Sequence, residues 1–320
     1  RHLVFFGTET TIGTTSTQDD MYIRWSDQES LTSWTPTATN TAGTQRLADG
    51  TRIVGALRGR DAIYIWTDTS LFIMRFVGPP FTFSFQQVGT NCGLIGKGAA
   101  VEVDGSAYWM SENGFFRYTG RLESLPCLVE DYVYDDINTV NKNHIYAGLN
   151  NLFGEVTWFY PGSGAASNNR SVTYNYMDSS AERPVWTTSS LARSTWADSA
   201  IFGKPHATEY DSSSTSDSTV GNTDGCTTYY EHETGNNQIK AGTSTAITAN
   251  IQSGDFDLGQ QGLDGDGELI MKIRRVLPDF LTQTGTTRVT LNLKNYPTDS
   301  EASSSLGPFD ITSSTTKIDT

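Results

Sequence analysis

The chain has 320 residues, a formal net charge of −14, 18% charged residues and 11% aromatic residues. This length is enough for one large all-β domain or two smaller ones. The acidic balance argues against a protein that grips nucleic acid through many phosphate contacts. No apolar run is long enough to form a membrane-spanning helix, so we expect no membrane anchor.

The composition favours strands and turns over helices. Thr, Ser, Gly and Asn make up much of the sequence, a mixture that supports many short strands joined by turns. The apolar residues do not repeat at helical spacing over a long window, and the best helical candidate is the short segment 128–138. We therefore predict an all-β fold.

The N-terminal part predicts strands at Leu3–Phe6 and Met21–Trp25, followed by a Thr-rich stretch, 31–50, that is mostly loop. Four strand candidates then occur within about 40 residues, which is the period of a propeller blade. They are Arg52–Leu57, Ala62–Thr67, Leu71–Val77 and Phe81–Val88.

The next unit contains the strongest turn signals. Asp104-Gly105 separates Ala99–Val103 from Ser106–Ser111, and Asn113-Gly114 precedes Phe115–Tyr118. Asp-Gly and Asn-Gly favour tight hairpins because both residues tolerate positive φ. The run Ala107–Met110 is apolar throughout, so we expect this strand to be buried on both faces.

Two further units follow, and the second is the weaker. The third has strand candidates at Ile145–Leu149, Glu155–Tyr160, Ser171–Tyr176 and Val185–Thr187, and the fourth at Ala200–Phe202, His206–Tyr210 and Thr227–Glu231. We predict a β-propeller-like body of four-stranded antiparallel blades over residues 1–235. Its blade-like units lie near residues 51–88, 99–125, 145–187 and 198–232.

Residues 236–320 differ from the preceding residues in having longer strand candidates. They predict a smaller β-sandwich-like region or antiparallel sheet, incomplete at its C-terminus. Arg288–Lys294 alternates polar and apolar residues, which indicates a half-exposed strand. The strand candidates are Ile247–Gln252, Gly267–Pro278, Thr287–Tyr296 and Gly307–Ile318.

Two segments resemble ligand loops superficially. Gly93–Gly98 is glycine-rich, but Asn91 stands at the first glycine of a phosphate loop and Gly98 at its Ser or Thr. A plain connection between blades is favoured. Asp264–Glu268, with Asp255 and Asp257 upstream, supplies carboxylates for a cation without the spacing of a calcium loop. An acidic turn is favoured there, so we predict no metal or cofactor.

Catalytic patterns are weak. His2, His144, His206 and His232 are isolated, and Cys92, Cys127 and Cys226 are too sparse for a disulfide framework or metal motif. A glycosidase needs two carboxylates at a set separation, which the sequence does not define. We predict no catalytic residues and a protein that is not an enzyme.

The aromatic and basic side chains have simple structural interpretations. Arg58, Arg60 and Lys97 could line a constriction, although solvation at the surface is the simpler reading. A set of aromatics inside apolar runs could form a sugar platform, but core packing is favoured. The set is Trp66, Phe72, Phe76, Tyr108, Trp109, Phe115, Phe116, Trp158 and Phe159.

Several blocks together resemble a known family, the tail nozzle or tail-hub proteins of short-tailed bacteriophages. These proteins are also called packaged-DNA stabilisation protein or tail tubular protein B. The blocks span nearly the whole chain. They are Tyr22–Ser30, Trp34–Pro36, Asn91–Ile95, Tyr108–Phe116, Leu125–Cys127, Ser253–Gly259, Arg274–Phe280 and Leu293–Pro297.

The resemblance implies a β-propeller body in a homo-hexameric ring, located in the virion tail below the portal and adaptor proteins. It also implies neighbouring tail fibre or needle proteins, and a channel that retains genomic DNA and conducts it during ejection without sequence-specific binding. The resemblance transfers no catalytic residues to this chain.

An acidic conduit is consistent with that role, because acidic walls repel phosphates. Acidic side chains are therefore expected on the channel face and outer rim, with Asp131, Asp135, Asp136, Asp211 and Asp217 as candidates. Two alternatives remain open: a tail-associated propeller glycoside hydrolase and a receptor-binding tail protein.

Overall fold

The computed structural model confirms the all-β class. It describes residues 1–198, 201–211, 226–240, 243–253, 271–296, 299 and 304–319. The chain divides into two compact units, Arg1–Thr245 and Ala246–Thr320; the sequence-based boundary was placed between residues 235 and 236. Among the described residues the one α-helix is α1 (Glu130–Asp136), shorter than the predicted segment 128–138.

Unit 1 begins with a three-stranded antiparallel sheet, sheet 1. Its strands are β1 (Val4–Phe6), β2 (Tyr22–Trp25) and β3 (Gly43–Arg46), and the 3-10 helix η1 (Thr15–Thr17) lies between β1 and β2. Strand β3 lies in the stretch predicted to be mostly loop. Gly43 pairs with Trp25, and a Cβ at Gly43 would lie 2.3 Å from the indole. Glycine therefore lets the Trp25 ring cover β3.

Three four-stranded antiparallel meanders follow and match the predicted units. Sheet 2 contains β4 (Ile53–Arg58), β5 (Ile63–Thr67), β6 (Ser70–Gly78) and β7 (Thr82–Thr90). Sheet 3 contains β8 (Ala100–Val103), β9 (Ser106–Ser111), β10 (Gly114–Tyr118) and β11 (Leu122–Leu125). Sheet 4 contains β12 (Tyr146–Asn150), β13 (Glu155–Tyr160), β14 (Arg170–Asn175) and β15 (Trp186–Ser189).

The predicted tight hairpin in sheet 3 is present. Asp104 and Gly105 have φ values of 49° and 87°, the left-handed conformation that a two-residue hairpin turn requires. All four residues of Ala107–Met110 in β9 are buried, as the apolar run predicted. The turn conformation and the burial of β9 therefore both agree with what the sequence predicted for this hairpin.

Sheet 5 corrects one strand prediction. It contains β16 (Thr195–Ala197), β17 (His206–Asp211) and β18 (Cys226–Glu231). The predicted first strand, Ala200–Phe202, is wrong: Ile201 and Phe202 lie in an exposed turn. Trp196 takes the strand position because its ring stacks on Phe159 at 5.5 Å.

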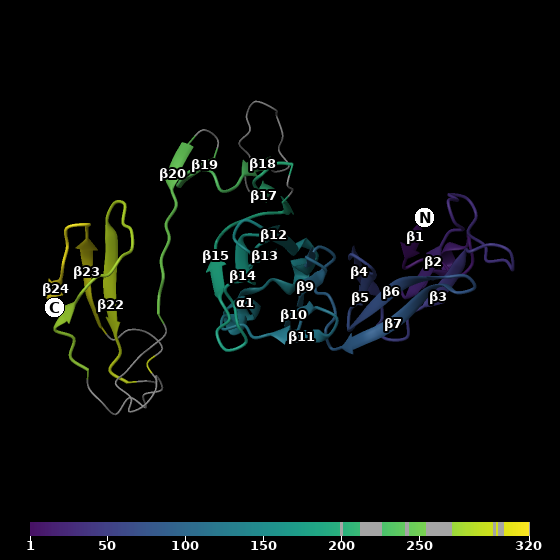
Figure 1. The fold of residues 1–320 in the computed structure, drawn as a ribbon, viewed down its shortest axis with the longest axis horizontal. Coiled ribbons are helices and arrows are strands. Elements are labelled where there is room, and N and C mark those ends of the chain that lie inside the picture. Colours follow the sequence, from purple (N-terminus) through teal and green to yellow (C-terminus); the bar gives the residue numbers. More distant parts are fainter. Residues whose placement is uncertain are drawn as a thin grey trace. The chain divides into compact units, whose positions relative to one another are not determined.

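The first strands of sheets 2 to 5 lie beside one another in chain order: β4 beside β8, β8 beside β12, and β12 beside β16. Figure 1 shows the sheets of unit 1 following one another from purple to teal. A parallel bridge joins Gly98, just before β8, to Tyr146 at the start of β12. The described strands form no closed barrel or ring.

Two apolar clusters hold unit 1 together. One, which includes Trp25, Ile65 and Phe72, lies between sheets 1 and 2. The larger, which includes Trp109 and Trp158, joins sheets 2, 3 and 4. Because alternate residues of a strand face opposite sides, Ile65 and its neighbour Trp66 enter different clusters. Sheet 2 therefore has apolar neighbours on both faces.

Three tryptophans tie each sheet to the one before it. The indole N–H of Trp109 donates to the Cys92 carbonyl at 2.8 Å, in the segment that joins sheets 2 and 3. Trp158 in sheet 4 donates to Ala99 at 3.0 Å, and Trp196 in sheet 5 donates to Leu149 at 2.7 Å. Each indole thus buries a large ring while its polar group is satisfied.

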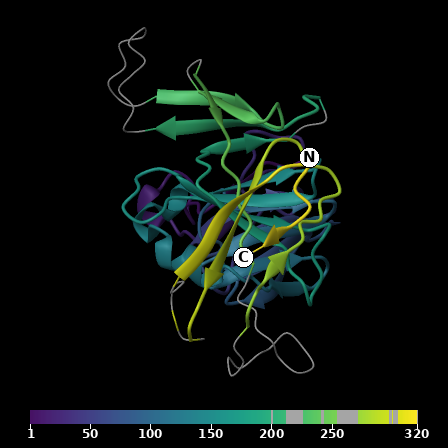
Figure 2. The ribbon, with the colours of Figure 1, turned by 90° about the vertical axis from the view of Figure 1, so that its left-hand side faces the viewer.

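Unit 2 contains two described two-stranded antiparallel pairs, whereas a sandwich stays a prediction. They are β21 (Arg275–Val276) with β24 (Ile318–Asp319), and β22 (Thr287–Leu293) with β23 (Ser304–Ile311). Figure 2 shows β22 and β23 as neighbouring yellow-green arrows. A further hairpin, β19 (Asn237–Lys240) with β20 (Thr243–Ala246), crosses the boundary between the units.

The alternation predicted for β22 is confirmed, since Val289 and Leu291 are half-buried while Arg288 and Thr290 are exposed. The strand predicted at Ile247–Gln252 is wrong. That segment forms no strand, and Ile247 and Ile251 are exposed. Although the segment contains apolar residues, no strand among the described residues pairs with it.

Three predicted strands are shorter in the structure, and Thr287–Tyr296 ends at Leu293. In Gly267–Pro278 only Arg275–Val276 is a strand among the described residues, and Gly307–Ile318 breaks after Ile311 into a turn. No described helix has the length and apolarity needed to cross a membrane.

Candidate functional site

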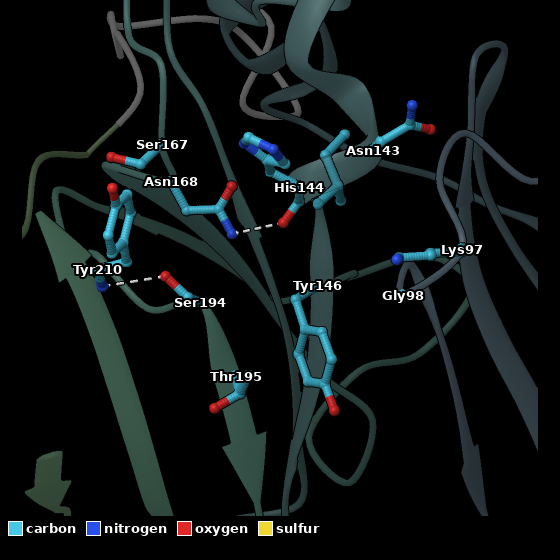
Figure 3. Close-up of a pocket in the computed structure, with 11 residues that line it drawn as sticks. Lys97, Gly98, Asn143, His144, Tyr146, Ser167, Asn168, Ser194, Thr195 and Tyr210 are labelled. Carbon is cyan, nitrogen blue, oxygen red and sulfur yellow. Dashed lines mark hydrogen bonds between the residues drawn. The ribbon is translucent and has the colours of Figure 1, made fainter. Parts of the chain in front are cut away.

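A cavity of about 540 Å³ lies where the first strands of sheets 3, 4 and 5 begin (Figure 3). We call it the first-strand pocket. Its lining comes from separate parts of the chain, brought together by the adjacency of β8, β12 and β16. These parts are Lys97–Gly98, Asn143–Tyr146, Ser167–Asn168, Ser194–Thr195 and Tyr210.

The glycine-rich segment before β8 forms one wall of the pocket. The Ala147 N–H donates to the Gly98 carbonyl at 2.7 Å, which fixes the start of β8 against β12. A Cβ at Gly96 would lie 2.4 Å from the Lys142 carbonyl oxygen, so this close approach requires glycine. The 3-10 helix η2 (Thr139–His144), capped by the Asn138 side chain, supplies the adjoining wall.

Part of the same segment is unavailable as a phosphate cradle. The N–H groups of Leu94, Ile95 and Ala99 donate to the carbonyls of Thr67, Met110 and Gly96. Because these donors already have backbone partners, they are not available to an anion. The interpretation of Gly93–Gly98 as a connection between sheets agrees with this geometry.

Asn168 holds two walls of the pocket together. Its Nδ2 donates to the His144 carbonyl at 2.7 Å and to the Arg193 carbonyl at 2.9 Å. The residue is 3% exposed, and its Oδ1 has no hydrogen-bond partner. A buried acceptor without a donor costs free energy, so a donor that reached Oδ1 would be favourable; in this structure the atom is shielded from solvent.

A buried polar cluster lies beside the pocket residue Ser194, at sheet 5. Arg193 is 4% exposed and lies 3.6 Å from the Glu209 carboxylate and 4.0 Å from the Tyr230 ring centroid. Tyr230 Oη donates to Glu209 at 2.8 Å. The charge of Arg193 is therefore balanced within the sheet, although burial lowers its pKa.

His232 completes this cluster as a neutral acceptor. Arg193 Nε donates to His232 Nε2 at 2.9 Å, and the imidazole packs 4.5 Å from Trp196. Burial, followed by the nearby Arg193 charge, lowers the pKa of His232 to about 4. The imidazole is therefore uncharged at neutral pH, as the hydrogen bond requires.

The other histidines form no shared centre. His2 Nδ1 contacts the Ser26 carbonyl and His144 Nδ1 the Ala166 carbonyl, both within hydrogen-bond distance. His206 bonds to the Tyr229 hydroxyl. In the described ranges, no group of three or more His, Cys, Asp or Glu could hold a metal ion.

The acidic candidates have different environments. Asp131 and Asp135 are exposed on α1, whereas Asp136 pairs with Arg170 at 3.2 Å. The side chain of Asp211, together with Asp217, Asp255, Asp257 and the turn at Asp264–Glu268, lies outside the described residues.

The basic candidates differ in their surroundings. Arg58 and Arg60 are exposed at the end of β4 and in the following turn, while Lys97 lines the first-strand pocket.

The core-packing interpretation of the aromatic set holds for most of its members. Trp66, Trp109, Phe115, Trp158 and Phe159 are fully buried, and Phe72 and Tyr108 are nearly so. Phe76 is the clear exception because it is 64% exposed.

The thiols of Cys92 and Cys127 are free, and burial raises the pKa of each to about 11. Both are thus poor nucleophiles at neutral pH. The side chain of Cys226 lies outside the described residues.

Sequence reasoning singled out Lys97 and His144 but missed Asn168, Ser194 and Tyr210 as pocket residues. Their residue types are common in loops and strand ends, and no spacing links them. These residues come together only because β12 and β16 are neighbours in the folded chain. In the comparisons with known proteins, no family model and no curated protein matches this chain.

Proposed function

We propose that the chain is a structural component of a phage tail, forming a ring-shaped nozzle or hub below the portal and adaptor proteins. In this proposal six copies surround a channel that retains packaged DNA and conducts it during ejection. Tail fibre or needle proteins are further neighbours. The sequence resemblance supports this assignment, and the arrangement of the sheets is compatible with it.

The observation that carries the proposal is the row of first strands, β4, β8, β12 and β16, in chain order. Successive meanders with neighbouring first strands are the arrangement of consecutive propeller blades. We therefore propose that sheets 2 to 5 are blades around a common axis. Because the described strands leave this arc open, additional strands or copies would complete it.

Rigidity of the arc supports a conduit. The large core cluster spans sheets 2, 3 and 4, and the indole hydrogen bonds of Trp109, Trp158 and Trp196 tie neighbouring sheets. Bending one sheet away from the next would expose these rings and break their hydrogen bonds. Such a wall could keep its shape while DNA passes.

The negative charge of the chain suits a channel through which DNA passes better than one that holds DNA by phosphate contacts. Six copies repel one another if each carries −14, so assembly needs subunit contacts that are apolar or oppositely charged. The exposed Asp131 and Asp135 follow the last strand of sheet 3, and this location favours the outer rim for them. Salt should therefore promote ring assembly by screening.

Native mass spectrometry and electron microscopy of the full chain, at low and high salt, test the proposal. We expect a closed ring whose population increases with salt, and the same ring within assembled tails. A chain that stays monomeric under all these conditions and is absent from purified tails would contradict it.

The hydrolase alternative gains no support from the first-strand pocket. The described residues that line it include no carboxylate, whereas glycoside hydrolysis normally uses a pair of them. Incubation of the chain with host envelope polysaccharide, followed by analysis for released oligosaccharides, addresses this alternative directly.

A further inference from the structure

We propose that the first-strand pocket binds a saccharide ring without cleaving it. The inference goes beyond the structural role proposed above and does not depend on it. It rests on the size of the cavity, its hydrogen-bonding groups, its aromatic side chains and its lack of carboxylates.

The cavity has the dimensions of a small-molecule site. Its volume of about 540 Å³ lies within the range typical of ligand pockets, roughly 300–1,000 Å³. Residues from five separate segments contribute, so the pocket is formed by tertiary structure and not by one loop. Ser194 is fixed by accepting the Tyr210 N–H at 3.1 Å, which gives this wall a defined shape (Figure 3).

The hydrogen-bonding groups distinguish a hydroxyl-rich ligand from an anion. The unpartnered Oδ1 of Asn168 needs a donor, which an ionised phosphate or carboxylate cannot provide. A sugar hydroxyl can donate to Oδ1 and also accept from Lys97 or from a Ser or Thr hydroxyl. The mixture of acceptor, cation and hydroxyls therefore matches a sugar better than a free anion.

Aromatic rings supply the apolar contacts that a sugar ring requires. Tyr146 and Tyr210 both line the cavity, from β12 and β17, and Figure 3 shows them on different sides of it. Tyr210 is 41% exposed, so a ligand could cover part of its ring. Tyrosine combines an apolar face with a hydroxyl, which suits the C–H face and hydroxyl edge of a pyranose.

Binding without cleavage follows from the charge of the lining. Described residues around the cavity include no Asp or Glu to protonate a leaving group or to stabilise an oxocarbenium ion. Single-stranded nucleic acid also uses aromatic rings and basic side chains. Here the lining holds a single lysine, too few cations to follow a phosphate backbone, so nucleic acid is the disfavoured ligand and becomes an outcome of the test.

Saturation-transfer difference NMR on the full chain tests the proposal. The probes are glucose, galactose, N-acetylglucosamine and short oligosaccharides from host envelope polysaccharide, with inorganic phosphate and oligothymidylate as competitors. We expect saturation transfer to at least one sugar, no displacement by either competitor, and no hydrolysis products.

Variants locate the binding. Tyr146→Ala and Tyr210→Ala should each weaken sugar binding about ten-fold, the effect of roughly 1.4 kcal/mol, and Lys97→Ala should weaken it about three-fold. Tyr132→Ala is the matched control, because Tyr132 is a 57% exposed tyrosine on α1 outside the pocket. Lys97 and Tyr210 are exposed, so their variants keep the test valid if Tyr146→Ala fails to fold.

The proposal is overturned if the folded chain transfers saturation to none of the sugars, or if the pocket variants bind as tightly as Tyr132→Ala. Displacement of the sugar by oligothymidylate would instead identify a nucleic-acid site. Released hydrolysis products would refute binding without cleavage. None of these outcomes depends on whether the chain forms a ring.

Discussion

Strand β9 of unit 1 and strand β22 of unit 2 show how the same secondary structure reaches different degrees of burial. Both lie in antiparallel ladders. In β9, Ala107–Met110 are buried on both faces because sheet 3 lies between sheets 2 and 4. In β22 only alternate residues are half-buried. Burial is therefore decided by how many layers surround a strand.

This difference extends to the energetics of the two units. Unit 1 buries five large aromatic rings completely in its main cluster, including Trp109 and Trp158. Among the described residues of unit 2, Ile311 and Ile318 are the buried apolar side chains. Apolar burial is the dominant favourable term in folding, so substitutions should be much more costly in unit 1.

The largest expected effect is truncation of a buried tryptophan. Trp158→Ala should destabilise unit 1 by about 3–5 kcal/mol, since it creates a cavity and removes the hydrogen bond to Ala99. Tyr296→Ala, an aromatic truncation at a 68% exposed position in unit 2, should change stability by less than about 0.5 kcal/mol. Urea unfolding followed by circular dichroism measures both; equal costs would refute the contrast.

A pH effect should be specific to unit 1, which contains all four histidines. The pKa of His232 is lowered from 6.5 to about 4 in the folded chain, so the unfolded state binds the proton more readily. Stability contributed by this site is present above pH 6.5 and is lost as the pH falls toward 4. Because the ring is partly exposed, we expect a loss of about 1–2 kcal/mol.

The control for this effect is His232→Gln, which can still accept from Arg193 but does not titrate. Its stability relative to the wild type should increase as the pH decreases from 6.5 to 4.5. Thermal unfolding across this range measures the difference. Parallel pH profiles for the two proteins would show that His232 does not carry the effect.

Glycine substitutions should separate crowding from backbone strain. A Cβ at Gly93 in unit 1 would lie 2.1 Å from the Asp68 carbonyl oxygen, so Gly93→Ala should cost about 3 kcal/mol. Gly285 in unit 2 has φ of +80° with open space around it, so Gly285→Ala should cost about 1 kcal/mol. Thermal unfolding compares them, and a larger cost at Gly285 would contradict the difference in crowding.

The smallest effect is expected at ion pairs. Arg288 and Asp310 in unit 2 are 67% and 59% exposed, so Arg288→Ala should change stability by less than about 0.5 kcal/mol. The Arg170–Asp136 pair in unit 1 is less exposed, at 38% and 28%, and Arg170→Ala should cost about 1 kcal/mol. Urea titrations at low and high salt check the order, and equal costs for the two substitutions would show that exposure does not matter.

Local chemistry in the sequence determined much of the fold. The turn at Asp104-Gly105 defined its hairpin because both residues adopt positive φ, and the alternation around Arg288 identified β22. Sheets 2 and 4 follow the predicted strands closely, and sheet 3 contains the three predicted strands plus β11, which was not predicted. Within the candidate site, sequence reasoning reached Lys97 and His144, yet gave no reason to connect them.

Tertiary structure decided the rest, because it depends on contacts between residues far apart in sequence. Strand β16 forms around Trp196 and not at Ile201, since the indole can stack on Phe159 and bond to Leu149. The same docking of β16 beside β12 brings Asn168 between two walls and forms the first-strand pocket. Periodicity reports which face of a strand is apolar, but only packing decides which neighbour covers it.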